Sequence, residues 1–250
     1  MKAARALCLV LAAALAVGCT EAYRWPDRMS RRPPPRVEAP EGHYVIEQGD
    51  TMYSIAFRYQ LDFRELAAWN DIGSDYLIHP GQMIRLTPPP GFAPIRTTPI
   101  DSPPPTGSVG TLPPPRPPIQ GPPQPAEVVV KLTWRWPTAG GVVKPFGDGG
   151  KGVDIGGTLG QPVVAAAPGK VVYSGAALKG YGELIIIKHD DVHLSAYGYN
   201  RRRLVAEGVT VAAGQPIAEL GMGPEQKPVL HFEVRRRGKP VDPAAYLPRP

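Results

Sequence analysis

The sequence predicts two folded units of different class, a small α+β module and an all-β domain, joined by a proline-rich linker. Three observations indicate this division. The 250 residues include 33 prolines and 28 glycines, too many for one continuous globule. Helical periodicity is confined to residues 52–69. From residue 128 onward, short β-type runs alternate with turns rich in glycine, proline and aspartate, and no stretch has the pattern of a long amphipathic helix.

The N-terminus, residues 1–18, has the pattern of a signal peptide. Lys2 and Arg5 precede an apolar run at 6–17, which is too short to cross a hydrocarbon core of about 30 Å as a helix. The run and the following Gly-Cys pair resemble a bacterial lipoprotein signal, which implies cleavage before Cys19 and attachment of a lipid anchor there. In bacterial lipoproteins of this kind, the residue after the lipidated cysteine influences sorting between membranes. Thr20 at this position, rather than Asp, implies the outer membrane. Simple secretion is the alternative.

Charge and cysteine content limit the choice of partners and cofactors. A net charge of +6 and a pI near 9.4 favour an acidic partner such as anionic lipid, a cell-wall polymer or nucleic acid. Both cysteines lie within the first nineteen residues, so the folded parts have neither a disulfide nor a cysteine metal site. No cofactor is expected.

Two segments have the composition of connecting chain. Residues 19–42 are polar, basic and proline-rich, with too little apolar content to offset the entropy of ordering, and predict a disordered tether. Residues 88–127 form the predicted linker, and sixteen of the forty residues 87–126 are proline. A polyproline conformation at about 3.1 Å per residue would reach on the order of 120 Å. The linker could therefore present the last domain far from the first.

Residues 43–87 predict a strand, two helices and a second strand. Residues 44–46 form the first strand signal, and Asp50 or Thr51 can cap a helix with apolar residues at i, i+3, i+4 and i+7. Asp62, with Glu65 three residues later, suggests a capping box for the second helix. A Pro-Gly turn then leads into a closing strand at 83–86.

The motifs Gly49-Asp50-Thr51-Met52-x-x-Ile-Ala and Ile78-x-Pro80-Gly81-Gln-x-Ile identify this segment as similar to a LysM module. LysM modules bind N-acetylglucosamine-containing glycans, so the resemblance implies peptidoglycan as a partner and does not imply nucleic acid. Cap and turn chemistry would demand several of the same residues, and His43 and His79 are typical surface histidines. The glycan-binding groove implied by the resemblance is lined by Gly49, Asp50, Thr51, Met52, Ile78, His79, Pro80 and Gly81.

Residues 128–250 predict an all-β domain of about 120 residues, long enough to bury a core. Polar and apolar residues alternate at 229–234. In a strand this alternation places His231 and Glu233 on one face, and Leu230 and Phe232 on the other. The predicted strands lie at 142–143, 163–167, 171–173, 184–187, 194–199, 209–212, 216–220 and 229–234.

The order of Gly-Val-Asp154-Ile, Pro-Gly-Lys-Val-Val at 168–172, Gly-x-x-Ile-x-Ile-x-His189 and Leu-His231-Phe-Glu resembles the lysostaphin-like, or LytM, peptidase domain, from about residue 134 to 247. The segments 134–137, 180–189 and 241–248 narrow the resemblance to NlpD-type lipoproteins, which combine a lipid anchor, a LysM module and a LytM domain in this order.

Active members of the peptidase family hold zinc through a histidine, an aspartate four residues later and the second histidine of a His-x-His motif. The resemblance places these ligands at Gly150, Asp154 and His231, and the accessory histidines at Tyr199 and Val229. Two remaining ligands are too few for a catalytic zinc site, and neither valine nor tyrosine is a suitable base at neutral pH. We therefore predict no metal and no catalytic residue, and expect Asp154, Tyr199, Val229 and His231 to line a partner-binding groove or to persist as structural remnants.

His189 and His193 are the only other histidines in this domain. They flank Asp190-Asp191, a spacing that could suggest a metal site but better fits a hairpin turn. Arg201, Arg202 and Arg203 are either partners for an acidic surface or a solvated basic edge.

The resemblance implies an outer-membrane lipoprotein on the periplasmic face that binds peptidoglycan and activates a periplasmic N-acetylmuramoyl-L-alanine amidase during daughter-cell separation, without being an enzyme itself. A zinc endopeptidase with an atypical ligand set that includes His189 or His193 is one alternative. A purely structural tether between membrane and wall is another.

Overall fold

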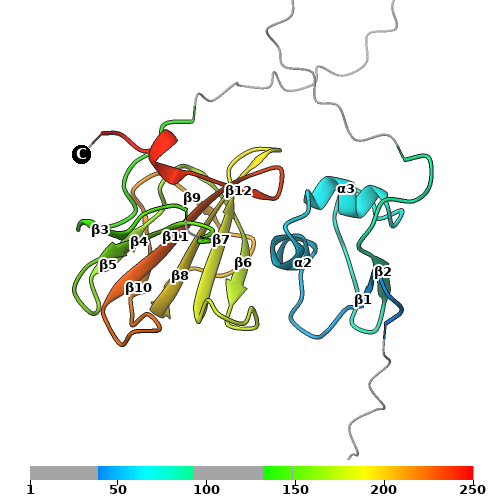
Figure 1. The fold of residues 1–250 in the computed structure, drawn as a ribbon, viewed down its shortest axis with the longest axis horizontal. Coiled ribbons are helices and arrows are strands. Elements are labelled where there is room, and N and C mark those ends of the chain that lie inside the picture. Colours follow the sequence, from blue (N-terminus) through cyan, green and yellow to red (C-terminus); the bar gives the residue numbers. More distant parts are fainter. Residues whose placement is uncertain (1–38, 93–131, 148, 250) are drawn as a thin grey trace, which may run out of the picture. The chain divides into compact units, whose positions relative to one another are not determined.

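The computed structural model describes residues 39–92, 132–147 and 149–249 (Figure 1). The predicted signal peptide, Cys19, most of the tether and most of the linker lie outside these residues. The N-terminal part, 39–92, and the C-terminal part, 132–249, are described separately.

The N-terminal part has the predicted strand–helix–helix–strand order. Strands β1 (His43–Val45) and β2 (Met83–Arg85) pair antiparallel, with Tyr44 opposite Ile84. Helices α2 (Met52–Tyr59) and α3 (Phe63–Ala68) lie between them in sequence. Ile55, Leu66 and Ile84 are fully buried and join the helices to the two-stranded sheet. Among the described residues, no helix is long and apolar enough to span a membrane.

Both helices begin at residues that the sequence singled out. Thr51 caps α2, since its hydroxyl accepts a hydrogen bond from the Ser54 amide at 3.0 Å and the Ser54 hydroxyl accepts one from the Thr51 amide at 2.9 Å. Asp62 caps α3 by accepting from the Arg64 amide at 3.0 Å. The Asp62 carboxylate accepts from the amide of Arg64, one residue before the Glu65 amide that a capping box would use, and it also binds the Arg64 side chain.

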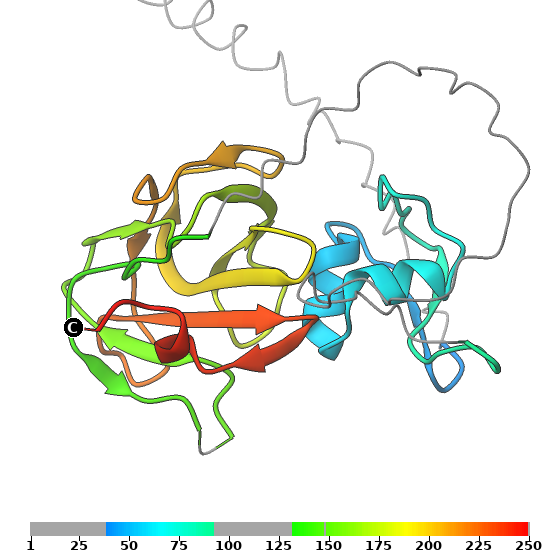
Figure 2. The same ribbon diagram turned by 90° about the horizontal axis from the view of Figure 1, so that it is seen from above.

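The C-terminal part is an antiparallel sheet of ten strands, counted over the described residues. Its main path runs β3 (Val142–Lys144), β4 (Val153–Gly156), β11 (Val229–Arg236), β8 (His193–Arg203), β7 (Glu183–Lys188), β6 (Gly169–Gly175) and β9 (Thr210–Val211). β10 (Pro216–Leu220) pairs with β8 and with β5 (Pro162–Val164), and β12 (Lys239–Val241) forms a hairpin with β11 (Figure 2). A short 3₁₀ helix, η1 (Pro243–Ala245), follows. The predicted all-β class is confirmed.

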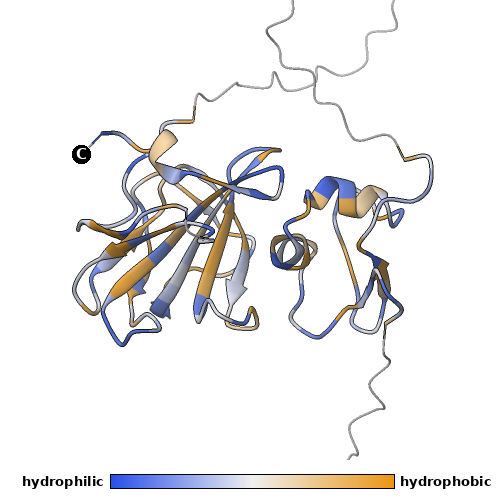
Figure 3. Cartoon of the chain, viewed as in Figure 1, coloured by the Kyte–Doolittle hydropathy of each residue, from blue (hydrophilic) through white to orange (hydrophobic). Residues whose placement is uncertain are grey.

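Three strands, β4, β5 and β12, differ from the predicted ones. β5 ends at Val164, so the predicted strand at 163–167 was too long. Ala165 and Ala166 are nevertheless fully buried, because their methyl groups pack in the core outside a strand. β4 and β12 were not predicted, since each is short and rich in glycine, proline or charged residues. Hydrophobic residues run along the longer strands (Figure 3).

Strand β11 has the predicted division into two faces. Leu230 and Phe232 are fully buried in the hydrophobic core, together with Ile155, Ile185 and Tyr197. The alternation places the polar side chains of β11 on the other face of the sheet. This division fixes the register of β11 against β4, because a shift of one residue would expose the core residues.

Strand β8 is continuous but contains two β-bulges. Against β7, its register changes between the pairs Glu183–Asn200 and Ile185–Tyr197, so β8 has one extra residue beside Tyr199. Against β10, it changes between Glu219–Arg202 and Leu220–Asn200, which leaves Arg201 as the extra residue. Such β-bulges alter the direction in which side chains point, and they occur often near functional sites.

We predict that Asn70→Ala destabilises the N-terminal part by roughly 2 kcal/mol, because Asn70 connects α3 to β2. Its amide nitrogen donates to the Leu66 carbonyl at 2.8 Å and to the Arg85 carbonyl at 2.9 Å, and its oxygen accepts from the Arg85 amide at 2.7 Å. Backbone amides of residues 43–87 should exchange with deuterium on the order of thirtyfold faster. The exposed Ser74→Ala is the control. Equal exchange in both variants would contradict this role.

Candidate functional site

The residues that the sequence assigns to the remnant of a metal site lie together on adjacent strands. β4 and β11 are neighbours in the sheet (Figure 1). Their register places Asp154 opposite His231. The His231 Nδ1 donates to the Asp154 Oδ1 over 2.6 Å, and the two side chains are only 15% and 19% exposed. The two remaining ligands of the predicted set are therefore in direct contact with each other.

The second nitrogen of His231 also faces a carboxylate. Nε2 lies 3.1 Å from the Oε1 of Glu233, two residues further along the same face of β11. Glu233 in turn accepts a hydrogen bond from the Tyr181 hydroxyl at 2.8 Å and from the Arg235 Nε at 2.7 Å. The four side chains and Asp154 form one connected polar network.

This network determines the charge of His231. Burial by itself would lower the pKa of the imidazole, but the hydrogen bonds to Asp154 and Glu233 outweigh that effect and raise its pKa to about 9. Glu233 is held ionised, since its bonds to His231 and Arg235 lower its pKa against the opposing effect of burial. At neutral pH both nitrogens of His231 are therefore protonated, and each donates to a carboxylate, Nδ1 to Asp154 and Nε2 to Glu233.

The other positions of the predicted zinc site lack metal-binding or basic groups. Gly150 lies in a glycine-rich loop, where it forms an isolated bridge with Gly147. Val229 begins β11 and is 8% exposed. The centre of the Tyr199 ring lies 5.6 Å from the centre of the His231 ring. Among the described residues, no group of three or more His, Cys, Asp or Glu side chains could hold a metal ion.

An open cleft of about 490 Å³ lies at this end of the sheet. Three of the four predicted groove residues, Asp154, Tyr199 and Val229, line it, and His231 lies behind them in contact with Asp154 and Tyr199. The sequence prediction missed five other residues of the site, because only a turn or a short strand marked them. They are Val143 and Lys144 on β3, Gly156 on β4, Lys227 in the loop before β11, and Tyr181, which donates to Glu233.

Tyr199 has an unusual backbone conformation. Its φ of 60° lies in the left-handed region, where a bulky aromatic residue is strained. Tyr199 lies at the β-bulge that β8 forms against β7, and one type of bulge has a residue, usually glycine, in this conformation. The Tyr199 side chain lines the cleft.

His189 and His193 do not join this network. The predicted hairpin turn is present, and the Asp190 carboxylate accepts from the amides of Val192 and His193 and from the His193 ring at 2.8 Å. The His189 Nδ1 donates to the Pro168 carbonyl at 2.8 Å, and its Nε2 lies 2.7 Å from the Ser195 hydroxyl. Burial lowers the pKa of His189 to about 4, so this imidazole is neutral.

The predicted glycan groove is only partly available at the surface. The Gly81 amide donates to the Ile46 carbonyl at 2.8 Å, which joins the turn at 78–81 to the start of the loop at 46–51. Gly49, His79, Pro80 and Gly81 are exposed and Ile78 is half-buried.

The remaining three groove residues have structural contacts. Asp50 accepts hydrogen bonds from the Tyr44 hydroxyl and the Arg58 guanidinium, Thr51 caps α2, and Met52 is 1% exposed in the core. The Met52 side chain packs in the hydrophobic core of the N-terminal part.

These features define the class of protein, a LysM module combined with a peptidase-like all-β domain. Residues 44–87 match the LysM domain, and residues 148–243 match Peptidase family M23.

The chain belongs to the NlpD family of lipoproteins, as the sequence predicted. It is 44% identical over 242 residues to the "Lipoprotein NlpD/LppB homolog" of Pseudomonas aeruginosa, which covers 86% of this chain and 80% of that protein. It is 37% identical over 256 residues to the "Murein hydrolase activator NlpD" of Salmonella typhimurium, with 82% and 68% covered. The zinc containing peptidase from Vibrio cholerae is a solved structure with 30% identity, a TM-score of 0.41 and coverage of 45% of this chain and 39% of that one.

We predict that His231 and His189 give the C-terminal part opposite responses to pH. The pKa of His231 is raised on folding, so its stabilisation is complete below about pH 6.5 and is lost as the pH rises towards 9; the shift corresponds to roughly 3 kcal/mol. The pKa of His189 is lowered, so its stabilisation is present above about pH 6.5 and is lost as the pH falls towards 4.

Urea unfolding between pH 4 and 9.5 measures both effects. His231→Gln should flatten the alkaline side of the stability profile and leave the acid side. The exposed His79→Gln, in the N-terminal part, is the control and should leave both sides unchanged. An alkaline decline that persists in His231→Gln would contradict the assigned charge.

Proposed function

We propose that this protein is a lipid-anchored activator of a periplasmic N-acetylmuramoyl-L-alanine amidase, that it binds peptidoglycan through its LysM domain, and that it does not cleave the wall itself. One observation carries the proposal: His231 is bonded through both ring nitrogens to carboxylates beside an open cleft. Relatives named murein hydrolase activators support it.

The lack of hydrolysis follows from the side chains in the cleft. A zinc peptidase needs three protein ligands and a base that activates water. Here Gly150 and Val229 offer no donor atom, and both ring nitrogens of His231 are bonded to carboxylates. Burial also raises the pKa of the Tyr199 phenol, which keeps it protonated at neutral pH and unavailable as a base.

Activation requires only that the cleft bind one state of the amidase more tightly than another. A ligand shifts a conformational equilibrium by its differential affinity for the two states. The cleft is suited to a protein segment, because Val143, Val229 and the Tyr199 ring offer apolar contacts, and Lys144, Asp154 and the ion pair of Lys227 with Glu225 offer polar ones.

The proposed location is the periplasmic face of the outer membrane, with the lipid at Cys19. Relatives named "Lipoprotein NlpD/LppB homolog" and "Outer membrane antigenic lipoprotein B" support it. The anchor would hold the protein near the wall, and the LysM domain would retain it there. Multiple acyl chains give stable attachment, because each buried CH₂ contributes about 0.8 kcal/mol.

We predict that the purified protein sediments with peptidoglycan sacculi but releases no dye from labelled sacculi by itself. Dye release should appear when the protein is added to the periplasmic amidases of the same bacterium, each tested at a concentration with little activity of its own. Release by the protein alone that a chelator abolishes would contradict the proposal, and would favour a zinc endopeptidase.

A substitution at Tyr199 separates a role in binding from a role in folding. Glycine tolerates a φ of 60°, so Tyr199→Gly should relieve roughly 1 kcal/mol of strain while removing the ring from the cleft. We expect unchanged or higher thermal stability together with an at least tenfold loss of amidase activation. Asp71→Gly, which relieves a similar conformation in the N-terminal part, is the control. Full activation by Tyr199→Gly would exclude the ring from the interface.

A further inference from the structure

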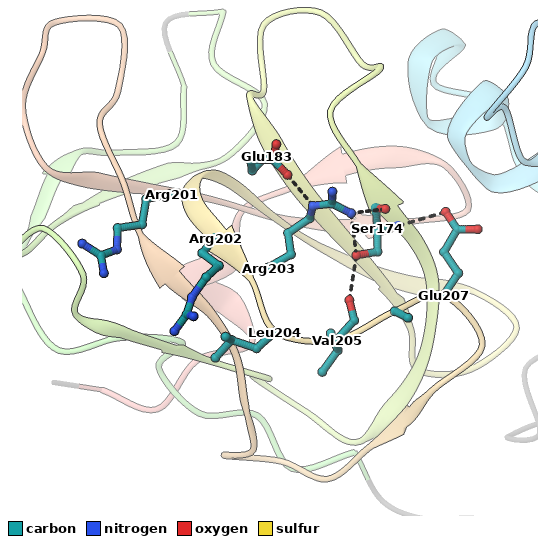
Figure 4. A pocket seen from close by; sticks show the side chains of 9 residues that line it. Ser174, Glu183, Arg201, Arg202, Arg203, Leu204, Val205 and Glu207 are labelled. Carbon is teal, nitrogen blue, oxygen red and sulfur yellow. Dashed lines mark hydrogen bonds and ion pairs between the residues drawn. The ribbon is translucent and has the colours of Figure 1, made fainter.

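Three consecutive arginines end β8 beside an open pocket of about 770 Å³. Figure 4 shows that their side chains diverge, with Arg203 turned towards Ser174 and Glu183 and the other two on the opposite side of the pocket. The side chains of Arg201 and Arg202 are 51% and 64% exposed. The exposed Leu204 adds an apolar contact next to them.

The β-bulge on β8 explains why two neighbouring arginines meet at one place. In a regular strand, consecutive side chains point to opposite faces. Because Arg201 is the extra residue in the register with β10, both Arg201 and Arg202 reach Glu219. The Arg201 Nε donates to Oε2 at 2.7 Å, and Arg202 donates to Oε1 through Nε at 3.1 Å and through a terminal nitrogen.

The pair has an excess of positive charge at a fixed position. Glu219 stays ionised, because its bonds to Arg202 and Arg201 lower its pKa. One carboxylate is thus shared by two guanidinium groups, each of which has five N–H donors. Several donors remain directed to solvent, and a carboxylate of another molecule could bind them in the forked geometry that arginine favours.

Arg203 has a different role. It is paired with the Glu183 carboxylate, and it donates to the Ser174 carbonyl and, at 3.1 Å, to the Ser174 hydroxyl. Its charge is therefore balanced inside the domain, and it forms the wall of the pocket rather than a free donor.

The arginine pair is close in the chain to the candidate site. Arg201 follows Tyr199 by two residues on β8, and the turn at 157–160 has one residue at the cleft and another beside Arg201. Gly157 lines the cleft, while a side chain at Gly160 would come within 3.2 Å of the Arg201 guanidinium. A segment that leaves the cleft along this turn would pass Arg201, which shares the Glu219 carboxylate with Arg202.

We propose that Arg201 and Arg202 bind acidic side chains of the amidase segment that occupies the cleft. This inference rests on the proposed function and adds the chemistry of the partner: apolar residues in the cleft, then one or more carboxylates beyond it. Exposed charges at the rim of an interface chiefly accelerate association and make it dependent on salt.

The test compares association kinetics of the full chain with the purified amidase that it activates. Arg201→Gln/Arg202→Gln should lower the association rate constant roughly tenfold at low salt, flatten its salt dependence and change the dissociation rate less than twofold. Arg236→Gln/Lys239→Gln removes the same charge from exposed positions of the β11–β12 hairpin and is the matched control. Thermal unfolding checks that both variants fold.

The possible outcomes separate the inference from the proposed function. Equal association rates for both double variants would overturn the inference and leave the proposed function intact. Weaker binding of Arg201→Gln/Arg202→Gln to sacculi, with unchanged amidase kinetics, would also overturn it and would assign the pair to carboxylates of the wall peptides. If the unmodified protein binds and activates none of the periplasmic amidases, the proposed function fails as well.

Discussion

The contact between Asp154 and His231 determines the chemistry of the C-terminal part. In the peptidase family that the sequence resembles, these two positions share a metal ion. Here their side chains bind each other directly at 2.6 Å, and Glu233 binds the second imidazole nitrogen. The charge of the imidazolium is balanced by the two carboxylates, and Tyr181 and Arg235 complete their hydrogen bonding. A buried charge is tolerated only with such partners.

The two bulges on β8 build the surface around this network. One places Tyr199 in a strained conformation with its ring in the cleft, and the other turns Arg201 and Arg202 to the same carboxylate. A regular strand would have directed these side chains to alternate faces. The same strand pairs with β7, β10 and β11, so the rigid sheet positions both features.

Strand faces and helix starts depend on local sequence pattern, and the sequence was sufficient to predict them. Alternation located the faces of β11, and cap residues located the starts of α2 and α3. The resemblance placed Asp154, Tyr199 and Val229 at one site, although they are far apart in the chain.

Other features depend on tertiary contacts and had no local signal. The burial of the Met52 side chain in the core of the N-terminal part is one such feature. The roles of Tyr181 and Glu219 depend on contacts between segments that are distant in the chain. The bulges at Tyr199 and Arg201 are changes of register between strands, and no residue type at these positions predicts them.

The charge of His231 is the claim on which the assignment of a binding cleft most depends. Nitrogen-15 NMR of the imidazole ring at neutral pH measures it directly, with His231→Gln to assign the signals. We expect both ring nitrogens to have the chemical shifts of a protonated imidazolium, and to keep them when Zn²⁺ is added. An unprotonated nitrogen whose signal moves on addition of stoichiometric Zn²⁺ would contradict this and would indicate a working metal site.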